Sequence, residues 1–226
     1  MRKLTVWCTA WAMLMGVALL GAADARAADV KIVGAMCHSG YDGMKADLNL
    51  LADMIGRPEL GAMADGMIAL ATQGRGIQGI DKSRPWGVLV GTDGTHVGGC
   101  GFVPVTDMKA AMDLVKSLAK DKVKEGEGGL YEIAGPHKTM YVQERHPGWA
   151  FIVDDPAVLD HVPANPLEVL AGLNEQYSVA MRLQPANLPD AVRKEMAEKA
   201  KQHAERHMKR HARENDQQFE ARQIIA

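Results

Sequence analysis

Aromatic residues and cysteines are scarce in this chain of 226 residues, and neither sign of charge dominates. Phe, Tyr and Trp make up 5%, so aliphatic side chains and the 14 methionines must fill the core. A formal net charge of −2 argues against a dedicated nucleic-acid binder. After residue 23 no apolar run is long enough to span a bilayer. Apolar residues at 47% and charged residues at 24% are typical of globular proteins and exclude wholesale disorder.

The first 27 residues have the pattern of a secretory signal peptide. Arg2 and Lys3 precede an apolar stretch over residues 4–23, and residues 25–27 (Ala-Arg-Ala) form an A-x-A cleavage pattern. We therefore expect cleavage near Ala28 and export to the periplasm or the extracellular space. The alternative is an uncleaved membrane anchor, because the apolar stretch approaches the length of a bilayer span. Cleavage would remove three basic residues and one acidic residue and change the net charge from −2 to −4.

Two of the three cysteines would remain after cleavage, because Cys8 lies in the signal peptide. Cys37 and Cys100 both fall at the ends of predicted strands. In an oxidising compartment an even number of cysteines permits one disulfide. Two buried free thiols are the alternative, and the sequence does not decide between them.

The pattern of apolar residues predicts an α+β fold, with an antiparallel sheet, helices packed on one face of it, and a long polar helix at the C-terminus. The predicted domains are residues 28–188, which form the α+β domain, and residues 189–226, which form a charged C-terminal helix. Thr106 is expected to cap one internal helix. Strands are predicted at residues 30–36, 86–90, 97–105, 130–134, 139–144, 149–153 and 177–183. Helices are predicted at residues 41–55, from 58 to about 70, from 107 to about 118, at 166–172 and from 189 to about 222.

A weak internal repeat links the two ends of the predicted domain. Residues 79–82 (Gly-Ile-Asp-Lys) lead into the strand at Trp86, and residues 172–175 (Gly-Leu-Asn-Glu) lead into the strand at Tyr177. The strands that begin near Val30 and Tyr177 also both lead into helices. The last fifty residues could thus be the start of a truncated second repeat, or the similarity could arise by chance.

Three short motifs carry a resemblance to a known group of proteins. They are residues 83–87 (Ser-Arg-Pro-Trp-Gly), residues 101–107 (Gly-Phe-Val-Pro-Val-Thr-Asp) and residues 148–152 (Gly-Trp-Ala-Phe-Ile). In this order they resemble uncharacterised secreted proteins that are common in planctomycete bacteria and contain a repeated α/β unit of unknown function. The resemblance covers about residues 30–220. It implies an exported α/β protein, and it supplies no catalytic residues.

Three histidines at four-residue spacing form the clearest candidate site. His203, His207 and His211 would lie on one face of the C-terminal helix. Two such imidazoles can bind one zinc or copper ion with further ligands from water or another element. The alternative is the solvated face of a basic helix, because residues 192–213 carry a local charge of +5, which disfavours a bound cation. The basic side of this helix could also bind anionic lipid or an acidic polymer.

The remaining polar residues suggest little chemistry. His96 and Cys100 have the even offset that places two residues on one face of a strand, but no third group orients them as a nucleophile pair. Asp154 and Asp155 precede a proline and fit a turn cap. We therefore expect an exported, non-catalytic protein with a binding or structural role at the cell envelope and an unidentified protein or envelope polymer as its partner. The alternatives are a metal-binding protein that uses the histidine face and a hydrolase with a hidden pocket.

Overall fold

The fold is α+β, as the alternation of apolar patterns predicts. The computed structural model describes residues 30–94, 97–119, 122–136 and 138–208. The chain divides into two compact units, Met1–Asn187 and Leu188–Ala226, and each is described separately below.

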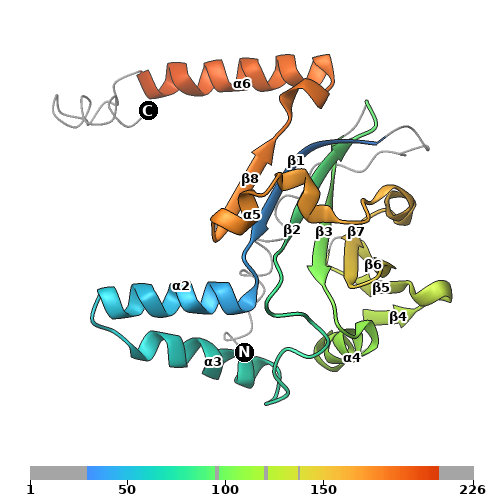
Figure 1. The fold of residues 1–226 in the computed structure, drawn as a ribbon. Coiled ribbons are helices and arrows are strands. Elements are labelled where there is room, and N and C mark those ends of the chain that lie inside the picture. Colours follow the sequence, from blue (N-terminus) through green and yellow to red (C-terminus); the bar gives the residue numbers. More distant parts are fainter. Residues whose placement is uncertain (1–29, 95–96, 120–121, 137, 209–226) are drawn as a thin grey trace. The chain divides into compact units, whose positions relative to one another are not determined.

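The first unit is built on one antiparallel sheet of eight strands in the order β4-β5-β6-β7-β3-β2-β1-β8 (Figure 1). Seven strands correspond to predicted ones. The eighth, β4, was missed because residues 120–129 read as a charged loop in which Val123 is the single large apolar residue. Pairing with β5 makes this segment a strand. The strands are β1 (Lys31–His38), β2 (Trp86–Thr92), β3 (Val97–Pro104), β4 (Val123–Glu125), β5 (Tyr131–Ala134), β6 (Thr139–His146), β7 (Trp149–Val153) and β8 (Val179–Leu183).

The helices of the first unit differ from the predicted ones in three details, the first of which is the short helix α5 (Leu173–Gln176), which was not predicted. Asp107, rather than Thr106, caps α4, because its Oδ1 accepts a hydrogen bond from the backbone N–H of Ala110 at 2.9 Å. The segment after Asn165 is a 3-10 helix, with Pro166 at its first position. The helices are α2 (Tyr41–Met54), α3 (Glu59–Ala71), α4 (Met108–Ala119) and α5 (Leu173–Gln176), with 3-10 turns η3 (Glu127–Gly129), η4 (Pro156–His161), η5 (Pro166–Leu170) and η6 (Pro185–Asn187).

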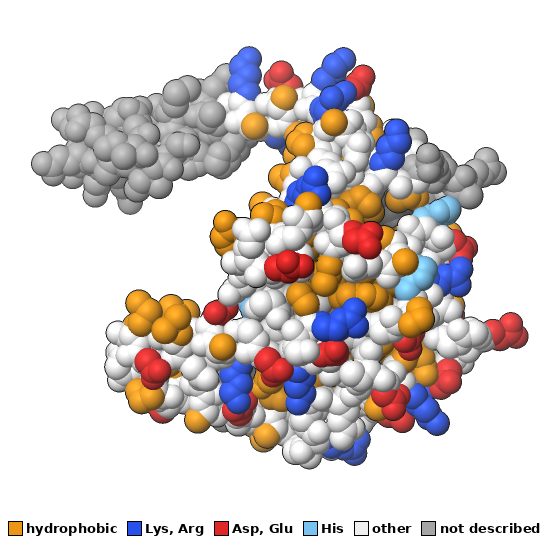
Figure 2. Space-filling view, in the orientation of Figure 1, with side chains coloured by type: hydrophobic (Ala, Val, Ile, Leu, Met, Phe, Trp, Pro, Cys, Tyr) orange, Lys and Arg blue, Asp and Glu red, His pale blue; other side chains and the backbone are white. Residues whose placement is uncertain are grey.

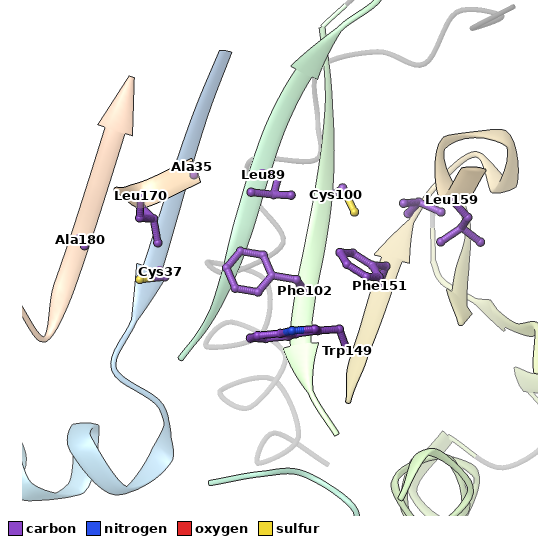
Figure 3. Close-up of a cluster of buried hydrophobic side chains, with 11 residues drawn as sticks. Ala35, Cys37, Leu89, Cys100, Phe102, Trp149, Phe151, Leu159, Leu170 and Ala180 are labelled. Atoms are coloured by element: carbon purple, nitrogen blue, oxygen red, sulfur yellow. The ribbon is translucent and has the colours of Figure 1, made fainter. Parts of the chain in front are cut away.

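One face of the sheet carries the larger core. Alternate residues of β7 point to it, and Figure 3 shows Trp149 and Phe151 beside Phe102 of the neighbouring strand β3. The Phe102 and Trp149 rings meet edge to face, with centroids 5.7 Å apart. Leu159 of η4 and Leu170 of η5 cover this face. Short 3-10 turns, rather than long helices, therefore close the main core.

The opposite face of the sheet is covered only in part. Helix α4 packs there through Met112 against Ala150, Val142 and Tyr131 of β7, β6 and β5. The other half of this face, formed by β2, β1 and β8, has no described helix of the first unit among its core contacts. Apolar side chains of this half are therefore left exposed.

The second unit contains helix α6 (Asp190–Met208). Its sequence is polar on most sides, and Met196 is exposed. Lys199 and Glu195 form an ion pair at 2.7 Å with the four-residue spacing that suits a helix surface. The predicted continuation of this helix to about residue 222 lies outside the described residues.

Candidate interaction surfaces

Helices α2 and α3 form an antiparallel hairpin that contacts the rest of the first unit only sparsely (Figure 1). We call this hairpin the arm. Asp65 of α3 ties the two helices together: it accepts hydrogen bonds from the Tyr41 hydroxyl at 2.9 Å and from Lys45 Nζ at 2.5 Å. The Lys45 and Tyr41 donors lower the pKa of Asp65, and partial burial together with the Asp65 carboxylate raises the pKa of Tyr41 to about 12. The ionised carboxylate thus holds the base of the arm.

The arm exposes far more apolar surface than its own packing hides. Within α2 only Ala52 is buried, whereas Met54 is 74% exposed and Leu70 of α3 is 83% exposed. Figure 2 shows apolar side chains gathered on the arm. Single exposed apolar residues are ordinary, but seven large ones on one hairpin make it a candidate interaction surface. The exposed group, which we call the apolar arm surface, consists of Leu50, Leu51, Met54, Ile55, Met63, Met67 and Leu70.

A second exposed apolar group lies on the uncovered half of the sheet. Val179, Met181 and Leu183 alternate along β8 and share one face, and we call them the β8 row. Each is about 60% exposed. Met36 of β1 is opposite Met181 and extends the row on the same face. The row therefore forms the edge of the half-sheet that α4 does not cover.

The three motifs that carry the family resemblance meet at one structural junction. Arg84 lies 4.0 Å from the Trp149 ring centroid and donates a hydrogen bond to the Gly148 carbonyl at 3.2 Å. The backbone N–H of Val105 donates to the same carbonyl at 3.1 Å. Gly148 has a φ of +78°, which favours glycine in the turn between β6 and β7. Packing and turn geometry explain these motifs without a ligand.

The structure describes only part of the predicted histidine site. His203 and His207 fall within α6, and His211 lies outside the described residues. Among the residues that the structure describes, no three His, Cys, Asp or Glu side chains are grouped to hold one metal ion. Zinc or copper binding by these histidines therefore stays a prediction from sequence.

Cys37 and Cys100 are free thiols buried in the main core. They belong to β1 and β3, and Figure 3 shows Leu89 of β2 between the strands that carry them. Two strand spacings separate their backbones by about 9–10 Å, beyond the reach of a disulfide. Of the two alternatives for these cysteines, the structure has the buried thiols.

We expect both thiols to resist labelling in the native protein. Burial raises the pKa of Cys100 to about 12 and also raises the pKa of Cys37, so little thiolate forms. At pH 8 the labelling of Cys100 by a thiol reagent should be on the order of a thousandfold slower than in the unfolded chain. Stopped-flow labelling without and with urea gives the two labelling rates and hence their ratio. Rapid labelling of either cysteine in the native protein would contradict this burial.

The other polar candidates serve structural roles where the structure describes them. Asp155 caps η4, because its Oδ1 accepts from the backbone N–H of Ala157 at 2.9 Å, as predicted. Asp154 forms an ion pair with Lys138. His96, the predicted companion of Cys100, lies outside the described residues. A Cys100 thiol that stays protonated at neutral pH is a poor nucleophile.

A shallow depression of about 370 Å³ lies between η5 and α5. Glu168 and Glu175 are the charged residues that line it. The Glu168 carboxylate accepts a hydrogen bond from Asn165 at 3.5 Å. The depression is open and has no convergent set of donors, so it does not form a defined ligand site.

In comparisons with known proteins, no protein-family model, curated protein or solved structure matches this chain. In the part of the chain that the structure describes, no helix is both long and apolar enough to cross a membrane.

The apolar arm surface was not singled out from the sequence, because Leu and Met at helical spacing predict a buried face equally well.

Proposed function

We propose that this chain is an exported, non-catalytic protein with a binding or structural role at the cell envelope. The apolar arm surface carries the proposal. A hairpin that leaves Leu50, Met54 and Leu70 largely exposed gains nothing from these side chains when it is alone in water. Burying them against another protein would provide hydrophobic stabilisation that the hairpin does not gain within its own chain.

The base of the arm is built to present this surface. Asp65 joins α2 and α3 through Tyr41 and Lys45, so the hairpin is held together where it leaves the sheet. The exposed apolar side chains come from both helices. An amphipathic helical surface of this kind suits a groove or a second helical surface on a protein partner.

Export is supported by the sequence. The signal-peptide pattern of residues 1–27 and the resemblance to secreted planctomycete proteins both favour it. Mass spectrometry of the protein purified from the cells that produce it tests this part of the proposal. A mature chain beginning near Ala28 in the envelope or secreted fraction is expected, and a cytoplasmic chain that retains Met1 would contradict export.

Site-specific photo-crosslinking in those cells tests the binding role. A photoreactive amino acid at Met54 should give discrete adducts with another protein, because this side chain is exposed on the apolar arm surface. The matched control is Asp113, an exposed polar position on the ordinary surface helix α4. Adducts at Met54 that do not exceed those at Asp113, or adducts with lipid alone, would contradict the proposal.

A further inference from the structure

The β8 strand leaves one edge of the sheet without a partner among the described residues. β8 pairs with β1 and is the last strand in the sheet order. Monomeric proteins commonly block such an edge with a charged side chain, a proline or a bulge. Residues 179–183 contain no proline and no acidic residue, and their register with β1 is regular. The one charged side chain, Arg182, donates a hydrogen bond to the Val169 carbonyl of the same chain at 3.0 Å.

The hydrogen-bond phase shows which backbone groups face outward. Ser39 N–H donates to the Ser178 carbonyl, and Gln184 N–H donates to the Val33 carbonyl, both at 2.8 Å. In an antiparallel pair the hydrogen-bonded positions alternate, so Ala180 and Arg182 also bond to β1. The N–H and C=O groups of the β8 row therefore point to the open edge.

This edge is complementary to itself. A two-fold axis at Met181 would place Met181 opposite Met181 of the second copy and Val179 opposite its Leu183. The outward backbone groups of the β8 row then face one another in the correct phase and can form about six hydrogen bonds. The apolar side chains of both rows share one face, which continues through Met36 of each copy.

We propose that a second copy of this chain binds the β8 edge, so that one antiparallel sheet runs through both copies. The inference rests on the proposed binding or structural role and names one partner for it. Charge also favours this register. Arg182 of each copy is opposite Ala180 of the other, so no like charges are directly opposed.

A charge swap at the axis tests the register. Sedimentation velocity across a concentration series should show a reversible dimer of the purified protein. The Met181→Lys and Met181→Glu variants should each weaken dimerisation by more than about tenfold, because each places two like charges directly opposite one another. Mixing the two variants should restore a dimer, since the opposed charges then attract. The matched control is Leu118→Lys, an equivalent change at an exposed apolar position of α4 that should leave the dimer unchanged.

The outcomes of these experiments test the β8 dimer separately from the proposed function. A protein that stays monomeric throughout the series, variants that dimerise like the parent, or a mixture that stays monomeric would overturn the β8 dimer. A variant that fails to fold cannot be rescued by mixing, so restoration also shows that both variants are native. Adducts from Met54 with another protein would leave the proposed function standing even if β8 does not self-associate.

Discussion

Replacing Gly87 with alanine is expected to prevent stable folding or to lower the free energy of unfolding by at least about 2 kcal/mol. A Cβ atom at this position of β2 would lie 2.0 Å from the Met36 carbonyl oxygen and 2.7 Å from the Cys37 Cα atom. Both obstructing atoms belong to the backbone of β1, so no side chain can move aside. The central strands would have to separate to admit the methyl group.

Gly98→Ala is the matched control for this effect. Gly98 also lies in a central strand, β3, but a Cβ atom there would meet no described atom within 4 Å. Its free energy of unfolding should stay within about 0.5 kcal/mol of the parent or rise slightly, because alanine loses less backbone entropy on folding than glycine. Urea denaturation followed by circular dichroism measures both variants. Similar losses in the two would contradict the close approach of β1 and β2.

Phe151→Ala should lower the free energy of unfolding by about 3–5 kcal/mol, which is the usual cost of removing a fully buried aromatic side chain. Phe151 has no exposed surface and lies in the main core on β7, which also carries Trp149. Its ring also meets the His146 ring edge to face, with centroids 6.1 Å apart. The smaller side chain would leave a cavity bounded by the sheet and the 3-10 turns. A lower urea midpoint with an unchanged slope is the expected result.

Met54→Ala is the control for the core substitution. Met54 is also a large apolar residue, but it is 74% exposed on the arm, so its truncation should change the free energy of unfolding by no more than about 0.5 kcal/mol. A loss at Met54 comparable to that at Phe151 would mean that the arm is packed in the free protein. That result would also weaken the proposal that the arm binds a partner.

Local sequence patterns predicted most of the helices and strands, because these elements depend mainly on neighbouring residues. A short continuous apolar run identified β7, and Pro58 with the helical spacing after it identified α3. The same reasoning failed for β4, which becomes a strand only by pairing with β5. It also misplaced the cap of α4 by one residue, since adjacent Thr106 and Asp107 are both able to cap and only the backbone path selects one.

The candidate surfaces were much harder to predict from the sequence. The histidine spacing drew attention to α6, whereas the described surface with the most exposed apolar side chains lies on the arm. Leu50 and Met54 have the spacing of an ordinary core face, and only the position of the arm relative to the sheet shows that no other described element of the first unit covers them. The free edge of β8 is likewise a property of strand order, which residue pattern does not encode.

The sequence by itself determined the α+β class, the antiparallel strands and most helix positions, because hydrophobic periodicity and turn residues act over a few neighbouring positions. Only the tertiary structure decided that β2 separates Cys37 from Cys100 and that α4 covers just half of one sheet face. Those outcomes depend on contacts between segments far apart in the chain. The same long-range packing left the apolar arm surface and the β8 row exposed, and both proposals rest on them.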